Sequence, residues 1–456
     1  MRTEHADVAI IGAGIVGIAC AYHLALSGRA SRIVLIDPLA PMSLTSAASG
    51  ENYRNWWPHR VMTSFTDLSI DLMEQIARDS GSRLHMTRRG YALATRQARP
   101  DALLRQLHEG YGADAAGKIR IHDRSSKGSY RPALSADWET APDGVDVIAD
   151  RGLIAAHFPG FDPEVATILH IRRAGDISGQ QMGGYMLETV RARGGKLMRG
   201  KVVEVASTGA SAIGVEGESG RATVVADVVV NAAGPHVGDV AALVGRSLPV
   251  ETVFQQKIAF EDSLKAISRH QPFSIDLDGQ EIDWSPEEKA LLAEDSATAW
   301  LTRTMPGAIH CRPEGGDHGT WVKLGWAFNT TPSKVSDNLP YDPNFPEIVL
   351  RGASRLNPGL EAYYGRLPSR LSHYGGYYTM TRENWPLIGP MGPAGWYVAG
   401  ALSGFGTMAA CATGALIAGW VCGDRLPGFA ASLSLERYRD SRLMKSLLES
   451  ESTGVL

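Results

Sequence analysis

The sequence DVAIIGAGIVGIACAYHLALSGRASRIVLID, residues 7–37, decides the fold of this chain. Its first five residues form an apolar, strand-like run, and an Ala- and Leu-rich run at 18–26 has helical periodicity. A second strand-like run at 32–36 ends at Asp37. The pattern predicts a strand–turn–helix–strand unit within a parallel sheet.

Three glycines in the pattern Gly-x-Gly-x-x-Gly occupy the predicted turn, at Gly12, Gly14 and Gly17. Glycine at these points permits a tight turn, leaves room for phosphate beside the backbone, and lets the helix pack closely on the strand. Free N–H groups at the start of the helix would bind the pyrophosphate of a dinucleotide, and Asp37 would accept a hydrogen bond from its ribose. A glycine turn in an ordinary parallel sheet is the alternative interpretation.

The size and charge of the chain narrow the function classes. A length of 456 residues favours two domains, and a net charge of −4 offers no basic surface for nucleic acid or anionic lipid. The four cysteines form no Cys-x-x-Cys pair and no metal-like spacing with histidine, which is typical of structural thiols in a reducing compartment. The N-terminus runs directly into the first strand, so no secretory signal is expected. We therefore expect a cytoplasmic protein without a metal site.

Residues 404–421 form the one long apolar run. Its internal glycines and the absence of basic flanks favour a buried helix over a membrane span. A largely apolar run at 223–230 stops at an Ala-Ala-Gly turn, which predicts a buried parallel strand that brings its backbone to a ligand. Two polar insertions, near 122–146 and 264–299, have no assigned role, although the second contains a short helical pattern.

Further motifs follow the glycine-rich turn along the chain. They are the loop 45–50, the tripeptide Asp-Ile-Ser at 176–178, the run 229–235, and two C-terminal segments at 381–389 and 401–408. In this order the pieces resemble the family of FAD-dependent amine and amino-acid oxidoreductases, which includes sarcosine oxidase, glycine oxidase and D-amino acid oxidase. The resemblance covers nearly the whole chain.

The two C-terminal segments depart from the family pattern at particular positions. TRENWPLIG, residues 381–389, is similar to the signature T-P-D-G-x-P-x-I-G, with Arg-Glu-Asn in place of Pro-Asp-Gly at 382–384. Residues 401–408 are similar to a G-x-x-G-x-G turn, with Ala401 in place of its first glycine. The resemblance implies that the helix beginning at this turn faces the flavin.

The resemblance also implies an α/β fold with two parts. A Rossmann-like FAD-binding domain would be built from discontinuous segments, and an inserted α+β substrate domain would carry a mainly antiparallel sheet. The expected segments are 1–85, 166–248 and 375–430 for the FAD-binding domain, 86–165 and 249–374 for the substrate domain, and 431–456 for a C-terminal helix and tail.

Bound FAD is implied as well, held non-covalently. Gly376 and Ala47 stand where relatives carry a cysteine or histidine that links the flavin, and neither residue can form that bond. N–H groups at the start of the last long helix, together with the helix dipole, would stabilise negative charge on the N1/C2=O edge of the flavin. The expected cofactor-binding residues are Gly12, Gly14, Ile15, Val16, Gly17, Asp37, Thr45, Ser46, Ala48, Ser49, Gly50, Val203, Ala233, Gly234, Gly404, Phe405, Gly406, Thr407 and Met408.

Lys323 is the sharpest indication of chemistry. It is the single lysine of the apolar, aromatic strand WVKLGW at 321–326, where a lysine is usually an edge or solvent-facing residue. The segment resembles a Lys-Leu-Gly-aromatic strand of sarcosine oxidases, which implies a lysine near flavin N5. A cation there would promote electron transfer to oxygen by stabilising developing superoxide charge, so oxidase competence is expected.

Substrate recognition is expected to involve Arg54 and Tyr378. Arg54 lies just after the flavin-facing loop, and its guanidinium would suit an amino-acid carboxylate. An arginine stacked on the neighbouring tryptophans for packing is the alternative. Tyr378 agrees with a tyrosine of the sarcosine oxidase group, whereas Met408 stands where that group carries a carboxylate-binding lysine.

The leading hypothesis is an FAD-dependent amine or amino-acid oxidase or dehydrogenase. It would oxidise a C–N bond of a primary, secondary or N-substituted amine by hydride transfer to flavin N5, and the resulting imine would hydrolyse. Oxygen or another acceptor would reoxidise the flavin. Two alternatives stay open: a 2-hydroxy-acid dehydrogenase of the same fold, and a non-catalytic FAD-binding subunit of a larger complex.

Overall fold

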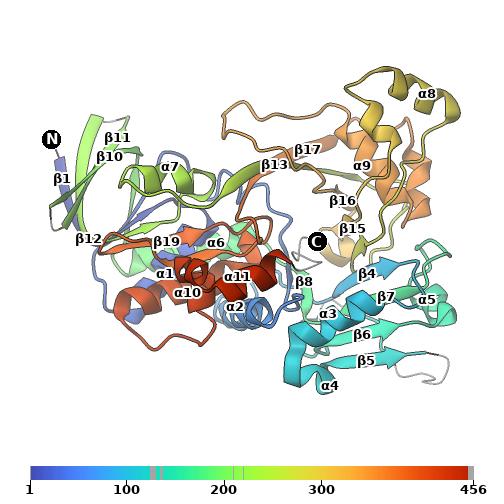
Figure 1. Cartoon of the computed structure of the whole chain (residues 1–456), viewed down its shortest axis with the longest axis horizontal. Coiled ribbons are helices and arrows are strands. Elements are labelled where there is room, and N and C mark those ends of the chain that lie inside the picture. The colour runs from blue at the N-terminus through green and yellow to red at the C-terminus, as the bar shows by residue number, and fades with distance from the viewer. Residues whose placement is uncertain (1, 124–129, 134–136, 209, 219, 450–456) are drawn as a thin grey trace.

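A computed structural model of the protein describes residues 2–123, 130–133, 137–208, 210–218 and 220–449 (Figure 1). Parts of the predicted insertion at 122–146 and of the predicted tail at 431–456 lie outside these residues. The described chain forms two large sheets and a short antiparallel pair of β3 (Asn52–Arg54) with β8 (Ala174–Asp176). In Figure 1 the first sheet lies at the left and the second at the right.

The glycine-rich stretch forms the centre of the first sheet. β1 (Arg2–Ile11) leads through the turn into α1 (Ile15–Ser27), and the chain returns as β2 (Ile33–Asp37), parallel to β1. β12 (Gly220–Asn231) lies parallel to β1 on its other side. The predicted strand–turn–helix–strand unit and the predicted parallel strand before the Ala-Ala-Gly turn are both confirmed.

The first sheet is completed by strands from distant parts of the chain. β9 (Lys196–Arg199) is parallel to β2, and the antiparallel strands β10 (Lys201–Thr208) and β11 (Ala210–Gly217) extend the sheet beyond β12. β19 (Trp396–Gly400) is parallel to β12 and pairs in turn with β18 (Leu387–Pro390). The FAD-binding part is therefore discontinuous in sequence, although the exact domain limits stay a prediction.

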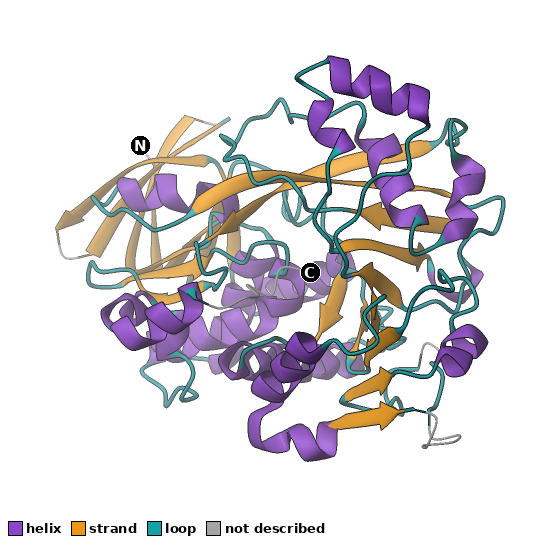
Figure 2. Ribbon diagram, turned by 45° about the vertical axis from the view of Figure 1, so that its right-hand side comes forward, coloured by secondary structure: helices purple, strands orange, loops and turns teal. Residues whose placement is uncertain are grey.

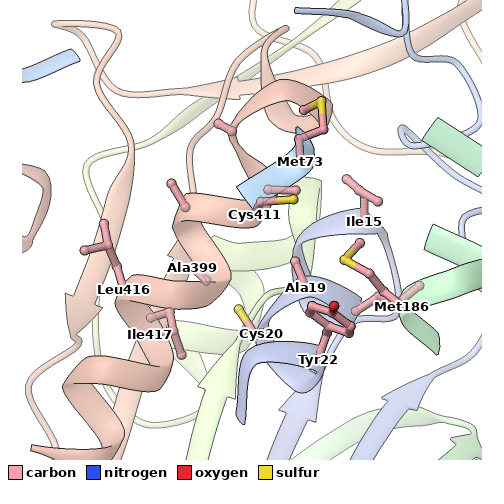
Figure 3. Packing of buried hydrophobic residues seen from close by; sticks show 14 of the residues in the cluster. Ile15, Ala19, Cys20, Tyr22, Met73, Met186, Ala399, Cys411, Leu416 and Ile417 are labelled. Carbon is pink, nitrogen blue, oxygen red and sulfur yellow. The ribbon is translucent and has the colours of Figure 1, made fainter. Parts of the chain in front are cut away.

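Four helices meet in one apolar core against this sheet: α1, α2 (Arg60–Asp79), α6 (Gly179–Ala192) and α10 (Gly406–Cys422). Figure 3 shows side chains of all four helices in this core. A Cβ on Gly414 would lie 2.4 Å from the carbonyl oxygen of Ala19, so glycine lets α10 approach α1 closely. The prediction of a buried helix here is confirmed, and across the described chain no helix is long and apolar enough to cross a bilayer.

The second sheet has nine strands. At one end lie four antiparallel neighbours, β17 (Leu371–Met380), β13 (Glu251–Glu261), β16 (Trp321–Gly325) and β15 (Ile309–Glu314). The sheet continues through β14, β4, β7, β6 and β5, which are Phe273–Asp276, Tyr91–Thr95, Thr167–Ile171, Val145–Ile148 and Ile119–His122. Among the described strands only the pairs β14–β4 and β5–β6 are parallel, so this sheet is mainly antiparallel.

Alternation along the long strands separates two faces of this sheet. Ile258 of β13 and Leu324 of β16 belong to an apolar core that packs against α9 (Phe345–Ser354). Because successive side chains point to opposite faces of a strand, Lys257 and Lys323 lie on the other face. That face carries the site described below.

The remaining helices cover the outside of the molecule, as the ribbon in Figure 2 shows. They are α3 (Asp101–Tyr111), α4 (Ala115–Lys118), α5 (Arg151–His157), α7 (Val237–Ala242), α8 (Pro286–Glu294) and α11 (Ser441–Leu448). α8 is the helix expected within the second polar insertion, and it begins with a capping box at Ser285 and Glu288.

A buried ion pair fastens the last described part of the chain. Nη2 of Arg437 lies 2.6 Å from Oε1 of Glu383, and both side chains are buried. The same guanidinium donates to the carbonyl oxygens of Trp385 at 3.2 Å and Pro386 at 2.7 Å. The turn of helix at Leu435–Arg439 is thereby tied to the segment TRENWPLIG.

We predict that Gly17→Ala destabilises the fold and releases the cofactor. A Cβ on Gly17 would lie 2.0 Å from the carbonyl oxygen of Gly12, so the turn must move, at a cost of about 3 kcal/mol. Urea unfolding and the flavin content of the purified protein measure the two effects. Gly117→Ala is the matched control, because no atom lies within 4 Å of its Cβ position. Equal stability of the two variants would contradict this account of the turn.

Candidate functional site

A first cavity lies where the glycine-rich turn, the loop 45–50, β17 and the start of α10 meet. Most of the residues expected to hold FAD line it, and Tyr378 lines it with them. Those residues are Gly14, Ile15, Val16, Thr45, Ser46, Ala48, Ser49, Gly50, Gly234, Gly404, Gly406 and Thr407. Segments separated by hundreds of residues therefore converge on one cavity, as the sequence motifs predict.

The glycine-rich turn has the geometry that its sequence indicates. Gly12 has φ +111°, and a Cβ on it would lie 2.2 Å from the carbonyl oxygen of Ala232. Ala13 donates its N–H to Oδ2 of Asp37 at 2.7 Å, which holds this carboxylate against the turn. Ser46 Oγ accepts from the N–H of Ile15 at 3.0 Å, so the loop 45–50 closes over the start of α1.

Other expected cofactor residues lie outside this cavity lining. Gly12 and Gly17 shape the turn from behind, and Ala233 follows β12 without lining the cavity. Val203 is half-buried in β10, beside a register shift in that strand. Phe405 and Met408 line a second cavity, described below.

The start of α10 fits the negatively charged edge of a flavin. Ala409 donates the first intrahelical bond, to the carbonyl oxygen of Phe405 at 3.1 Å, so the N–H groups at 406–408 precede the hydrogen-bonded ladder. Thr407 Oγ1 lies 2.8 Å from Ser49 Oγ, which joins the helix to the loop 45–50. A helix N-terminus within a cavity that also contains the dinucleotide turn is a site that accommodates FAD.

Two departures from the family motifs keep a backbone that favours glycine. Asn384 has φ +58° and Ala401 has φ +55°, both in the left-handed region. Asparagine enters this region at little cost, whereas alanine there costs about 1–2 kcal/mol. The substitutions therefore preserve the course of the chain, and the packing around Ala401 holds the strained residue in place.

The second cavity adjoins the first. The two share Ser49, Gly50, Lys257, Tyr378, Ser403, Gly404 and Thr407 among their lining residues. The second cavity adds the aromatic side chains of Trp57, Tyr91 and Phe273, together with Arg54 and His310. It is therefore placed to receive a substrate beside the cofactor cavity.

Arg54 stacks on aromatic rings in the wall of the second cavity, and its binding of a carboxylate stays a prediction. It stands at the end of β3, is 2% exposed, and lines the second cavity. Its Cζ lies 4.7 Å from the ring centroid of Trp57 and 5.9 Å from that of Tyr91. Burial lowers the pKa of Arg54 to about 10, so the guanidinium keeps its charge at neutral pH. Stacking on the aromatic rings thus holds a cation in the cavity wall.

Lys323 is buried, and it approaches the loop 45–50 from another side. Its Nζ lies 2.9 Å from Oε2 of Glu314 and donates to the carbonyl oxygen of Gly50 at 3.5 Å. It lines a third cavity, with Glu51 and Gly376, and does not line the first two. Burial, with the nearby charge of Arg312, holds the pKa of Lys323 below its ordinary value. The alternative of a solvent-facing lysine does not hold, because Lys323 is buried, and its role toward the flavin stays a prediction.

Sequence reasoning missed two further cations on the same face of the second sheet. Lys257 lines both the first and the second cavity, and its Nζ donates to Tyr378 Oη at 3.1 Å. Arg312 donates to the carbonyl oxygen of Gly50 at 3.1 Å and pairs with Glu314 at 2.9 Å. Lys257 is likewise the one basic residue of its strand, but Gln255 and Gln256 precede it, so the apolar pattern that singled out Lys323 is weaker there.

His310 is a neutral wall of the second cavity. Burial lowers the pKa of His310 to about 3, and the charge of Lys257 acts in the same direction. Gly325, its cross-strand neighbour, leaves room for the imidazole, because a Cβ there would lie 2.3 Å from His310 Nε2. Near neutral pH His310 therefore adds no charge to the cavity.

Comparison with known proteins places these observations in a family. The sequence model described as FAD dependent oxidoreductase matches residues 7–420. L-proline dehydrogenase from P. horikoshii has a similar structure, with a TM-score of 0.71, 16% identity, and coverage of 96% of this chain and 99% of that one. Glycine oxidase from Geobacillus kaustophilus has a TM-score of 0.66 and 17% identity, and the match covers 95% of this chain and 99% of that one. L-alpha-glycerophosphate oxidase from Mycoplasma pneumoniae, determined with FAD bound, has a TM-score of 0.64 and 12% identity. The match covers 94% of this chain and 98% of that one. A search of curated protein sequences found no match.

We predict that His310 makes the fold less stable as the pH falls. Its pKa is lowered from 6.5 to about 3, so between these values the unfolded chain binds a proton that the folded chain excludes. The resulting stability is complete above pH 6.5 and falls progressively toward pH 3. Between these values it should add a slope of about 1.4 kcal/mol per pH unit to the free energy of unfolding. His310→Gln should remove this part of the slope in urea unfolding, while His270→Gln, at an exposed position, should not. Equal slopes for His310→Gln and the parent would contradict a buried neutral imidazole.

Proposed function

Because the chain belongs to the FAD-dependent oxidoreductase family, we propose that it oxidises a C–N bond of an amine or amino acid. The enzyme class and the cofactor follow from the family; the substrate class is the proposal. One observation supports it most: a cavity that shares a wall with the cofactor cavity carries a buried arginine among aromatic side chains. L-proline dehydrogenase and glycine oxidase, which share the fold, act on amino acids by their names.

In this proposal the chain binds and orients the substrate. Arg54 receives the carboxylate, and the rings of Trp57, Tyr91 and Phe273 exclude water around the amine. Bound FAD supplies the acceptor for the two electrons of the C–H bond next to the amine nitrogen. An apolar cavity with cationic side chains lowers the pKa of a bound amine, which favours its neutral form, so little further acid–base chemistry is required.

The proposed acceptor is oxygen or another small oxidant, with Lys323 as the cation that assists its reduction. The ammonium is buried and reaches the loop 45–50, which lines the cofactor cavity. Its charge is balanced by Glu314 before any acceptor arrives. We also propose a cytoplasmic location, which the four free cysteines support.

The experiment that tests the substrate class is anaerobic reduction of the purified flavoprotein. The panel contains N-methyl amino acids, both enantiomers of ordinary amino acids, and 2-hydroxy acids. Bleaching of the flavin by amines, but not by hydroxy acids, is expected. Bleaching by hydroxy acids alone would overturn the proposal in favour of a hydroxy-acid dehydrogenase, and bleaching by neither class would favour a non-catalytic subunit.

Arg54→Met should weaken the binding of carboxylate substrates. Loss of a charge-assisted pair of hydrogen bonds costs about 2–4 kcal/mol, or roughly 30- to 1000-fold in Kd. The limiting rate of flavin reduction should change much less, because Arg54 contacts the carboxylate and not the reacting C–H bond. Rapid-reaction titration separates the two quantities. An amine without a carboxylate is the control ligand, and an equal loss of its affinity would indicate a packing role instead.

Lys323→Met should slow flavin reoxidation by oxygen by about 100-fold while leaving anaerobic flavin reduction nearly unchanged. Removal of a cation affects the step in which negative charge develops on oxygen. Stopped-flow absorbance follows both half-reactions in the same preparation. Lys334→Met, which removes an exposed lysine, is the control. Equal slowing of both half-reactions by Lys323→Met would assign the lysine to the architecture of the loop.

A further inference from the structure

Lys257 differs from the other buried cations of the site in having no carboxylate partner. Its side chain is 4% exposed, yet among the described residues it forms no ion pair. Tyr378, a neutral phenol, is its hydrogen-bond acceptor, at 3.1 Å. An ammonium has three donors, so this contact leaves donors for a ligand. A buried charge without a counter-charge is costly, which indicates that the counter-charge is supplied by a bound molecule.

The fold places Lys257 where a bound molecule can reach it. On β13 it pairs with Gly325 of β16, and Gly325 pairs in turn with His310 of β15. The imidazole of His310 lies over Gly325, and both His310 and Lys257 line the second cavity. The would-be Cβ of Gly50 lies 3.9 Å from Lys257 Cε, so the side chain passes close to the loop that lines both cavities.

Charges around the second cavity leave one positive charge in excess. The lining contains two cations, Arg54 and Lys257, and one carboxylate, Glu51. Glu51 is fixed, because its Oε1 accepts the N–H of Gly179 at 2.8 Å at the start of α6. The adjoining ion pairs do not offer a carboxylate to Lys257, because Glu314 and Asp176 already pair with the two cations Arg312 and Lys323.

We propose that Lys257 is a second anion anchor of the substrate cavity, and that the enzyme prefers amino acids or N-substituted amino acids that carry two carboxylates. This inference rests on the proposed function, with Arg54 as the first anchor. One carboxylate can pair with Arg54 but leaves Lys257 without an anion. A second carboxylate supplies the counter-charge that Lys257 lacks, in either protonation state of the amine. Tyr378, bonded to Lys257, lies at the junction of the two cavities and positions the ammonium.

The test compares ligands that differ by one charge at constant length. Glutarate and its monoamide are titrated into the oxidised holoenzyme, and the shift of the flavin absorbance gives each Kd. The parent enzyme should bind glutarate at least about 10-fold more tightly than the monoamide. Lys257→Met and Lys257→Gln should reduce this ratio to near 1, while Lys334→Met should leave it unchanged. Flavin content and circular dichroism identify any variant that fails to fold. If Lys257→Met fails to fold, Lys257→Gln, which keeps a polar side chain, carries the test.

Anaerobic reduction by glutamate and glutamine provides the second readout. The preference for glutamate should be lost in the Lys257 variants and kept in Lys334→Met. The proposal would be overturned if the Lys257 variants kept the parent's preference for the doubly charged ligand in both readouts. It would also be overturned if they lost affinity equally for the doubly and singly charged ligands. This second result would assign Lys257 to the flavin or to the carboxylate that both ligands share. If no amine reduces the flavin while the glutarate ratio behaves as stated, the proposed reaction fails and the second anchor stands.

Discussion

The carbonyl oxygen of Gly50 is the point on which the site depends, because two buried cations of the second sheet donate to it. Arg312 lies at 3.1 Å and Lys323 at 3.5 Å from this oxygen. The same residue lines both the first cavity and the adjoining second cavity. Charge-assisted hydrogen bonds from one sheet thus hold a loop that belongs to the other. Without these hydrogen bonds the two parts of the chain would still be in contact, but the loop 45–50 would not be held in a fixed position between the cavities.

The glycine-rich unit could be predicted from the sequence because its constraints are local. A Cβ on Gly17 would meet Gly12, and a Cβ on Gly12 would meet Ala232 just after β12, but the glycine spacing alone reveals both positions. The cations are different. Lys257 and Lys323 are each the one basic residue of their strand, yet one faces two cavities and the other pairs with Glu314. Strand register and the position of an acidic neighbour decide this difference, and a local sequence pattern predicts neither of them.

The conformation at the positions that depart from the family motifs could not be predicted from the sequence alone either. Asn384 and Ala401 replace glycines of the family motifs, but the backbone retains φ values of +58° and +55°. The tertiary packing therefore enforces the conformation for which glycine is usually required. Arg54 is a similar case: its sequence position allows either packing or ligand binding, and the structure places the stacked guanidinium in the cavity wall. In both cases the surroundings decide what a residue does.

The ion pair of Arg437 with Glu383 joins the end of the described chain to the interior of the enzyme. Glu383 immediately precedes Asn384, which lines the second cavity. Removing the arginine would leave a buried carboxylate uncompensated, which costs about 3–5 kcal/mol. Shortening the polypeptide before residue 437 is therefore not a neutral trimming. It would disturb the wall of the second cavity from a distant part of the sequence, so the boundary of an expressed fragment has to lie beyond residue 437.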